Sequence, residues 1–411
     1  MLNPPVNPLV SFDLQCGWCD RVHVASQPQR TCCECKRPLL ARYSLDPAIG
    51  EPIRADLPSR PRSLWRYREL LPVGSEAAIL TLGEGGTPLL RAERLGAQLG
   101  LSNLWIKDES QNPTGSFKAR GMSVALSRAV ELGVRRFCLP SAGNAAGAAA
   151  AYGALAGCRV RVYMPDDSGD AFFAECLASG AEVVPVAGTI ADCAQKMRQE
   201  CDPDVWFDLS TLKEPYRLEG KKTMGYELWE DLGADGTLPD VIVYPTGGGT
   251  GLVGMWKAFA EMQQLGWIGA RRPRMISVQA DGCAPIVRAY RDGAMTAAPV
   301  KDPCTAALGL RVPAAIGDFL ILRALRESHG CALTVTEEEW ANGQSWLAAD
   351  LGLFASPEGG AALAATKQAV ESGVVDPDDK IVVFNTGSGF KYPPATWPHG
   401  QSRPGGALSQ V

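Results

Sequence analysis

The sequence predicts an α/β protein built on parallel sheets. Between residues 103 and 387, short runs with the composition of buried strands alternate with segments whose apolar residues recur at helical spacing. Several of the strand-like runs end in a loop that carries glycine, serine or threonine. Alternation of this kind is typical of parallel sheets with helices on both faces, and such sheets bind ligands at the loops beyond the carboxyl ends of their strands.

Size and composition indicate a soluble enzyme that acts on small molecules. The chain has 411 residues, enough for two or three domains, and 46% of them are hydrophobic and 21% charged. The formal net charge of -5 gives no reason to expect nucleic acid or an anionic membrane as a partner. The N-terminal residues do not have the pattern of a signal peptide, and the alanine-rich run near residues 145–156 is too short to span a bilayer. A cytoplasmic protein is therefore expected.

Residues 1–42 are expected to form a unit of their own that binds a metal. Cys16 and Cys19 form one C-x2-C pair and Cys32 and Cys35 a second, with twelve residues between the pairs. Two such knuckles can surround Zn²⁺ with four thiolates, whereas the alternative is four unrelated buried cysteines. Cys33 offers a competing thiol in the second knuckle. A site closed by four thiolates has no open position, so the expected zinc is structural.

The main body is expected to begin after a linker rich in proline and arginine. A short helix at residues 64–73 and an extended segment at 77–95 lead into it. Residues 103–109 are expected to form a strand. Residues 117–133 are expected to form a helix, because apolar residues recur there at helical spacing.

The alternation continues through the rest of the body. A strand at residues 135–140 precedes a helix of small residues at 145–157, and buried strands at 158–165 and 181–188 flank a helix at 171–180. Later strands that end in loops with glycine, serine or threonine are expected at residues 240–245, 274–280 and 380–387.

Three of the loops have the composition of a ligand site. In "PSAGNAAG", Ser141 and Asn144 open a helix whose free N–H groups and positive dipole end suit a carboxylate. In "NTGSG", Thr386 and Ser388 offer hydroxyl groups. The loop "PTGGGTGLVG" has small residues that could surround a phosphate with backbone N–H groups: Gly247, Gly248, Gly249, Thr250 and Gly251.

The third of these loops also allows a dinucleotide site. Residues 249–254, "GTGLVG", match G-x-G-x-x-G after a strand, which alone is a weak signal. The motif follows about five strands, whereas the dinucleotide fingerprint normally opens the first βαβ unit of its domain. A Walker loop is excluded because no G-K-[ST] follows.

One lysine is placed to be a reactive amine. Lys118 follows the turn "NPTGS", in which Ser116 can cap a helix, and falls in the first turn of that helix. A helix N-terminus and loss of solvent both lower the pKa of an ammonium group. The alternative is an ordinary surface lysine. With a phosphate loop, a carboxylate loop and a late hydroxyl, a reactive lysine indicates pyridoxal phosphate.

With these segments, the chain resembles the threonine synthase branch of the fold-type II pyridoxal-phosphate enzymes, the tryptophan-synthase-β-like group. The resemblance extends from about residue 64 to 392, through "LGEGGTPLL", "NPTGSFKARG", "SAGNAAGAAAAYGALAG", "YRLEGKKT", "PTGGGTGLVG" and "NTGSG". It implies two domains after the zinc unit: a larger cofactor domain of residues 43–115 and 240–392, and a smaller mobile domain of residues 116–239. Residues 393–411 are expected to be a flexible tail. Relatives of this fold are often dimers, so the resemblance allows a homodimer.

The resemblance also implies residue roles. Lys118 would be the Schiff-base lysine, Asn144 the partner of the pyridoxal 3′-hydroxyl, and Thr386 the neighbour of the ring nitrogen. Gly247, Gly248, Gly249, Thr250 and Gly251 would hold the cofactor phosphate. A neutral hydroxyl beside the ring nitrogen leaves that nitrogen unprotonated, which suits β-elimination and replacement.

The implied reaction is that of a carbon–oxygen lyase acting on phosphate, in which O-phospho-L-homoserine and water give L-threonine and phosphate. Arg217 in "YRLEGKKT" matches an arginine expected near the substrate phosphate, and the alternative is a surface arginine paired with Glu214. Ser141 and the neighbouring loop amides would bind the substrate carboxylate.

Departures from the family pattern keep other activities open. Ala119 follows the lysine where threonine synthases usually have Asp, Ala145 stands where Thr is usual, and Gly248 lacks a common polar side chain. The "SAGN" and "GGGTGLVG" loops also resemble serine/threonine ammonia-lyases, the deaminases. A relative that replaces the phosphate of phosphoserine, such as cysteate synthase, is a third alternative. A catalytically silent relative that docks through its zinc knuckles is a fourth.

Overall fold

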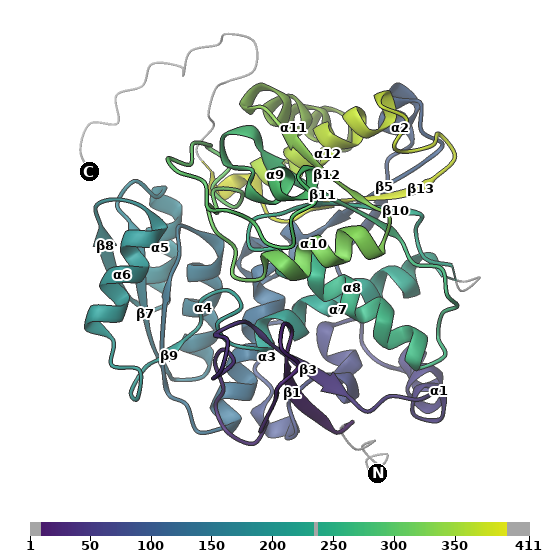
Figure 1. Cartoon of the computed structure of the whole chain (residues 1–411). Helices are drawn as coiled ribbons and strands as arrows, with labels where there is room; N and C mark the ends of the chain where they lie inside the picture. Colours follow the sequence, from purple (N-terminus) through teal and green to yellow (C-terminus); the bar gives the residue numbers. More distant parts are fainter. Residues whose placement is uncertain (1–9, 234–236, 393–411) are drawn as a thin grey trace.

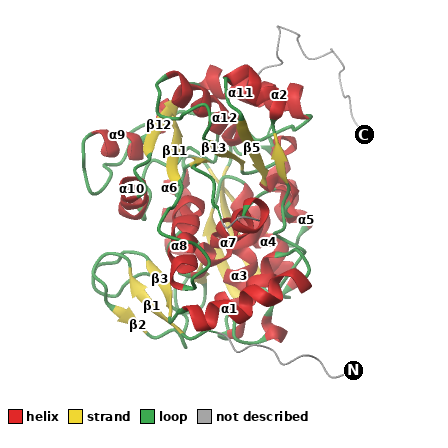
Figure 2. Ribbon diagram, turned by 90° about the vertical axis from the view of Figure 1, so that its right-hand side faces the viewer, coloured by secondary structure: helices red, strands yellow, loops and turns green. Residues whose placement is uncertain are grey.

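The computed structural model describes residues 10–233 and 237–392, and these residues form the α/β fold that the sequence predicts. The fold has two parallel sheets and a small antiparallel sheet (Figure 1). The antiparallel sheet lies at the opposite end of the molecule from α11 and α12 (Figure 2). The predicted tail, residues 393–411, lies outside the described residues.

The larger sheet has six strands in the order β12-β11-β10-β13-β5-β4. Its strands run parallel except the edge strand β4, which is antiparallel to β5. Their bounds are Leu89–Arg91 (β4), Asn103–Asp108 (β5), Val241–Pro245 (β10), Arg274–Ala280 (β11), Cys331–Val335 (β12) and Lys380–Asn385 (β13). Asp108 pairs with Asn385, so the loop that leads to Lys118 leaves the sheet beside the end of the last strand.

The strands of this sheet are apolar on both faces because helices cover both. In β10, Val241 and Val243 belong to one buried cluster, and Ile242 and Tyr244 to the other, as the two-residue period of a strand requires. One face is covered by α2 (Glu93–Leu99), α11 (Glu337–Leu351) and α12 (Pro357–Glu371). The other is covered by α8 (Thr250–Gln264), α9 (Pro285–Arg291) and α10 (Asp318–Glu327).

The smaller sheet is parallel throughout and has the order β8-β7-β6-β9. Its strands are Arg136–Pro140 (β6), Arg159–Pro165 (β7), Glu182–Val186 (β8) and Phe207–Asp208 (β9). Its helices, and the helix that follows it, are Lys118–Glu131 (α3), Asn144–Leu155 (α4), Asp170–Ala178 (α5), Ile190–Glu200 (α6) and Tyr216–Leu232 (α7). This sheet lies within residues 116–239, the predicted smaller domain; its movement stays a prediction.

Two glycines let α3 and α7 approach closely. A Cβ on Gly220 would lie 1.9 Å from the backbone oxygen of Arg120, and one on Gly121 would lie 2.8 Å from that of Arg217. Real side chains do not tolerate such distances, so glycine is needed at this crossing. The approach holds the helix that begins at Lys118 against the helix that carries Arg217.

The N-terminal unit is a three-stranded antiparallel sheet of β1 (Phe12–Cys16), β2 (Val22–His23) and β3 (Leu39–Tyr43), followed by α1 (Pro47–Asp56). It is attached to the body through buried polar contacts, since the Tyr43 hydroxyl donates to the Glu219 carboxylate at 2.9 Å.

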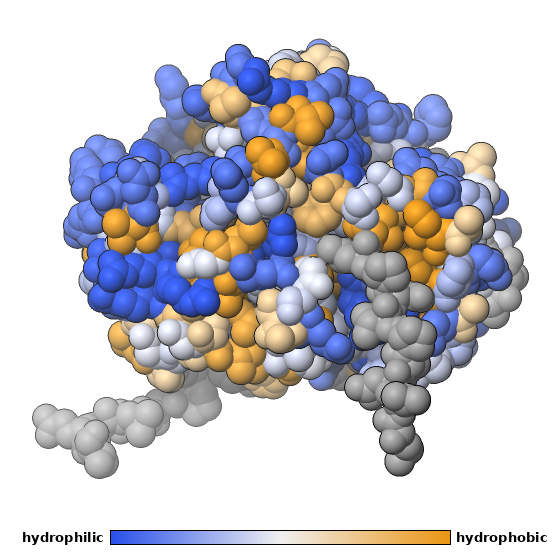
Figure 3. All heavy atoms as spheres, turned by 90° about the horizontal axis from the view of Figure 1, so that it is seen from below, coloured by the Kyte–Doolittle hydropathy of each residue, from blue (hydrophilic) through white to orange (hydrophobic). Residues whose placement is uncertain are grey.

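The face of the molecule seen from below mixes hydrophobic and hydrophilic residues (Figure 3).

The structure refines several predicted elements. The predicted helix at 64–73 is a 3-10 helix, Leu64–Leu70, and the segment 77–95 contains β4 and the first turn of α2 instead of remaining extended. The strands β4, β9 and β12 were not predicted; β4 and β9 have three and two residues, too few to show a periodic pattern. Across residues 10–233 and 237–392, none of the helices combines the length and apolar character needed to cross a membrane.

Candidate active site

A cavity of about 460 Å³ lies where strands of both parallel sheets end. It is bordered by the loops after β6, β7, β9, β10 and β13. It is lined by each residue predicted to contact cofactor or substrate: Lys118, Ser141, Asn144, Arg217, Gly247, Gly248, Gly249, Thr250, Gly251 and Thr386. The structure thus brings these residues together, and their individual roles stay predictions.

Lys118 is the first residue of α3, and its position is fixed by the loop before it. The Phe117 N–H donates to the carbonyl of Thr386 at 3.1 Å, and the Ser388 N–H donates to the carbonyl of Gly115 at 2.8 Å. Ser116 acts close to its predicted capping role, because its hydroxyl accepts from the Lys118 N–H at 3.4 Å, although Phe117 occupies the cap position.

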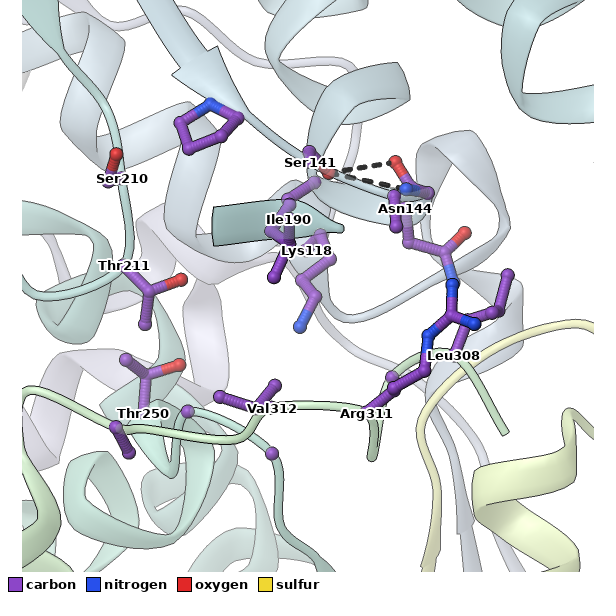
Figure 4. A pocket seen from close by; sticks show the side chains of 18 of the residues that line it. Lys118, Ser141, Asn144, Ile190, Ser210, Thr211, Thr250, Leu308, Arg311 and Val312 are labelled. Atoms are coloured by element: carbon purple, nitrogen blue, oxygen red, sulfur yellow. Dashed lines mark hydrogen bonds between the residues drawn. The ribbon is translucent and has the colours of Figure 1, made fainter. Parts of the chain in front are cut away.

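The Lys118 amino group points into the cavity, with Ser141 and Asn144 on one side and Thr211 and Thr250 on the other (Figure 4). Burial, and then the neighbouring Arg217 guanidinium, lower the pKa of Lys118 to about 7, while Glu358 opposes the shift. Lys118 is half-buried, and its side chain lines the cavity. The alternative of an ordinary surface lysine is therefore wrong.

Asn144 presents an unpaired acceptor to the cavity. Its Nδ2 donates to the Tyr392 hydroxyl at 3.0 Å, and that hydroxyl donates to Glu358 at 3.3 Å. The Glu358 carboxylate also accepts from the Gly309 N–H at 2.7 Å. This chain of donors orients the amide so that Asn144 Oδ1, which is buried and without a protein partner, can accept from a ligand hydroxyl.

The glycine loop after β10 forms a cup at the start of α8. Gly249 has a φ of 74°, which favours glycine, and α8 begins at Thr250, so the N–H groups of its first turn face the cup. A Cβ on Gly247 would lie 2.2 Å from the backbone oxygen of Gly309. At Gly248 a Cβ would lie 2.8 Å from the Thr211 Cγ2, so Thr211 fills the space of the missing side chain. The cup suits a phosphate dianion.

Arg217 is a buried cation on the cavity wall, 2% exposed. The alternative of a surface arginine paired with Glu214 is wrong, because the Glu214 carboxylate accepts from the backbone N–H groups of Tyr216 and Arg217 instead. The Arg217 guanidinium donates to the Leu209 carbonyl, while its Nε is buried without a partner. Burial lowers the pKa of Arg217, and Glu214 opposes this. An anion in the cavity would give the Arg217 guanidinium the partner that it lacks.

Ser141 and Thr386 border the cavity from the two sheets. The Ser141 hydroxyl accepts from the Ala146 N–H at 3.1 Å and from the Gly143 N–H at 3.3 Å, so it caps the start of α4. The Ser141 O–H donates to the Gly143 carbonyl at 3.4 Å, a long hydrogen bond that a substrate carboxylate could replace. Thr386 follows β13 and is 6% exposed.

The four predicted cysteine ligands meet at one point. Their sulfur atoms lie within 4.8 Å of one another, with Cys16–Cys35 at 3.4 Å and Cys19–Cys32 at 3.7 Å. A tetrahedron with Zn–S bonds of about 2.3 Å needs sulfurs about 3.8 Å apart, and disulfides are much shorter. Cys33 is exposed and outside this group. The alternative of four unrelated cysteines is wrong.

Several cavity residues were missed by the sequence reasoning. Glu358 and Tyr392 lie in no recognised motif, and Arg311, which pairs with Asp167 at 3.5 Å, follows no strand end. Lys221 does not line the cavity but contacts Thr250, which does. It lay inside the quoted "YRLEGKKT" without a role, and its spacing of four from Arg217 was the signal that both lie on one helix face.

Comparison with known proteins identifies the class. The profile of the family described as "Pyridoxal-phosphate dependent enzyme" matches residues 80–387. The chain belongs to this family of pyridoxal-phosphate-dependent enzymes. The glycine loop lies within the matched residues, so the interpretation of this loop as a dinucleotide site is wrong.

Its relatives place it more narrowly, with the threonine synthases. It is 36% identical to the threonine synthase of Methanocaldococcus jannaschii, over 88% of this chain and 89% of the relative. It is also 36% identical to that of Methanosarcina acetivorans, over 93% of each chain. Among solved structures, a threonine deaminase of T.th. is 27% identical with a TM-score of 0.61, covering 74% of this chain and 92% of its own. Maize serine racemase, 18% identical with a TM-score of 0.63 over 84% of this chain and 94% of its own, shows the shared fold.

Proposed function

We propose that the protein is a threonine synthase that converts O-phospho-L-homoserine and water into L-threonine and phosphate. The observation that carries the proposal is a buried, incompletely paired arginine, Arg217, in the same cavity as a lysine of lowered pKa. The substrate of a deaminase carries no phosphate, so a buried guanidinium set apart from the cofactor cup would then lower stability without a use. The curated relatives named threonine synthase support the same activity.

The cavity residues fit pyridoxal phosphate. Lys118 would carry it, Asn144 Oδ1 would accept from its 3′-hydroxyl, and Thr386 would face its ring nitrogen. The phosphate would lie in the cup of Gly247, Gly248, Gly249, Thr250 and Gly251. When bound, the cofactor supplies an electron sink for charge that develops on the carbons beside the substrate amine.

The protein groups carry the proton transfers and the binding. Lys118 is suited to take and return protons at the α and β carbons of the substrate, because a general base works best with a pKa near the operating pH. Arg217 would hold the phosphate that leaves the γ carbon. Ser141 and the free N–H groups at the start of α4 would bind the carboxylate.

Lys118 is expected to show its lowered pKa in its reactivity. The rate at which pyridoxal phosphate becomes attached to the cofactor-free protein should rise with pH around a midpoint near 7, because only the neutral amine is nucleophilic. Borohydride trapping and mass spectrometry measure this rate. Arg217→Met should move the midpoint upward, since it removes a neighbouring cation. A midpoint at the ordinary value of a free lysine would contradict the assignment.

We also propose that Cys16, Cys19, Cys32 and Cys35 bind a structural Zn²⁺. Cys32→Ser is expected to reduce the bound zinc from about one per chain to near zero and to lower the free energy of unfolding by at least about 2 kcal/mol. Metal analysis and urea unfolding measure the two effects. Cys33→Ser is the matched control, because Cys33 is exposed and outside the cluster, and it should change neither.

The remaining assignments follow from the resemblance. We propose a cytoplasmic enzyme of amino-acid biosynthesis that takes a small substrate and associates as a homodimer. The division into residues 43–115 and 240–392 as the cofactor domain and 116–239 as a domain that closes over it agrees with the two parallel sheets. Closure would keep bulk water from the reaction.

A substrate panel tests the function. The cofactor-loaded protein is incubated with O-phospho-L-homoserine, with threonine, and with phosphoserine plus sulfite. Release of phosphate with formation of threonine supports the proposal. Ammonia and 2-oxobutyrate from threonine, with no reaction of phosphohomoserine, would make it a deaminase, and cysteate from phosphoserine would make it the replacing relative. No reaction and no cofactor absorbance would favour a silent relative.

A further inference from the structure

A second buried lysine, Lys221, lies behind the glycine cup. It is 0% exposed, and its Nζ donates to Thr250 Oγ1 at 2.7 Å. The centroid of the Phe117 ring lies 5.0 Å from the Lys221 Nζ. Lys221 therefore touches the residue at which the cup becomes helix α8, and no step described above uses it.

Lys221 differs from its neighbour in its surroundings. Lys222 is equally buried but forms ion pairs with Glu219 at 2.7 Å and with Glu261 at 2.9 Å. Throughout residues 10–233 and 237–392, no carboxylate lies within ion-pair distance of Lys221. Buried ammonium groups are nearly always paired, because an unpaired one loses its hydration without compensation.

The charged groups around Lys221 are mostly cations. Arg217 lies one turn earlier on α7, and Lys118 begins the adjacent α3; Glu214 is the acidic group that opposes them. Helix α8 contributes the Thr250 hydroxyl, which accepts a hydrogen bond from the Lys221 Nζ. Burial, followed by Arg217 and Lys118, lowers the pKa of Lys221 well below its ordinary value. Positive groups therefore outnumber negative ones around Lys221, and one additional negative charge nearby would be stabilised.

The cup is where that charge would arrive. Gly247, Gly248, Gly249 and Thr250 all line the cavity. A protonated lysine can only donate hydrogen bonds, so Lys221 occupies an acceptor position of Thr250 and leaves the threonine O–H free to donate to an anion. The hydrogen bond thus links a titrating amine to the phosphate position through a single hydroxyl group.

We propose that Lys221 is a positioning residue for the cofactor phosphate: it orients the Thr250 hydroxyl toward the cup and takes up one proton from solvent when the dianion binds. The inference rests on the proposed cofactor site and adds a residue to it. Phosphate binding and protonation of Lys221 then stabilise each other. Affinity for the phosphate is expected to rise as pH falls, above about pH 7, where the phosphate remains a dianion.

The test uses pyridoxine 5′-phosphate, which has the ring and phosphate but no aldehyde that could react with Lys118. Titration calorimetry of the cofactor-free full chain, in two buffers of different ionisation enthalpy, gives the dissociation constant and the protons taken up. The wild type should take up protons on binding and bind more tightly at about pH 7.5 than at about pH 9. Lys221→Gln, which keeps a neutral donor and leaves Lys118 in place, should take up fewer protons than the wild type and bind about 10- to 100-fold more weakly.

Controls separate charge from structure. Unphosphorylated pyridoxine should bind the wild type and Lys221→Gln equally. Lys196→Gln, on the partly exposed face of α6, should behave as the wild type. Thr250→Val should weaken binding and make the further effect of Lys221→Gln smaller than in the wild-type background, because the lysine acts through the hydroxyl. If Lys221→Gln does not fold, proton uptake by Thr250→Val tests the inference: it should be smaller than in the wild type, because the hydroxyl links the phosphate to Lys221.

Wild-type affinity and wild-type proton uptake in a folded Lys221→Gln protein would overturn the inference while leaving the cofactor site intact. Equal weakening of pyridoxine and its phosphate would also overturn it, because it would indicate a merely structural lysine. No binding of pyridoxine 5′-phosphate to the wild type would overturn the cofactor site itself, and this inference with it.

Discussion

Lys118→Ala is expected to lower kcat for phosphate release from O-phospho-L-homoserine by about 10⁴-fold or more. The residue is at once the group that would hold the cofactor and the base placed to move protons, and burial beside Arg217 brings its pKa to about 7. Alanine removes both functions and leaves the cavity open. Steady-state phosphate release, measured with cofactor in excess, gives the loss.

The matched control is Lys367→Ala, whose side chain is 46% exposed and lies on α12 away from the cavity. It should retain wild-type kcat. Borohydride reduction and peptide mapping should place the pyridoxyl label on Lys118 in the wild type and on no lysine in Lys118→Ala. A label on another residue, or near-normal turnover in Lys118→Ala, would contradict the account of the site.

Arg217→Ala is expected to lower kcat/KM for O-phospho-L-homoserine by about 10²- to 10³-fold, mainly through a higher KM. Arg217 is 2% exposed, and its Nε has no protein partner, so its guanidinium can form charge-assisted hydrogen bonds with a phosphate. Any slow deamination of threonine should change little, because threonine has no phosphate. Kinetics on the two substrates separate these effects.

Two variants make the comparison specific. Arg217→Lys keeps the charge and loses the planar fork, so its loss should fall between those of the wild type and Arg217→Ala. Arg271→Ala, whose side chain is 85% exposed, should have no effect. An equal loss on both substrates would mean that Arg217 supports the fold and not the phosphate.

The structure shows what surrounds the three positions at which the sequence departs from the family pattern: Ala119, Ala145 and Gly248. Thr211, from the loop after β9, lies against Gly248, so a hydroxyl-bearing residue stands beside the position where the polar side chain is missing. Ala119 is buried at 0% exposure, so an aspartate there would need a partner. Ala145 lines the cavity beside Asn144. These positions are where substrate preference is expected to differ from that of the relatives.

The sequence by itself determined most strands of the two parallel sheets and three of the loops that border the cavity. Strand composition located β5, β6, β7, β8, β10, β11 and β13 to within a few residues. Because the carboxyl ends of parallel strands meet at one edge, loops far apart in the sequence could be expected to share a ligand. The cysteine spacing likewise determined which thiols could meet, since each pair closes a short turn.

Only the tertiary structure decided which partners these groups have. The Asn144 amide is oriented by Tyr392, 248 residues away, and Thr250 receives its hydrogen bond from Lys221, 29 residues away. Loss of solvent, not spacing, lowers the pKa of Lys118 and leaves the Arg217 Nε without a partner. Burial and hydrogen-bond partners depend on how helices pack, and here the close approach of α3 and α7 at Gly121 and Gly220 sets both. Sequence motifs alone therefore could not predict the burial or the hydrogen-bond partners of these residues.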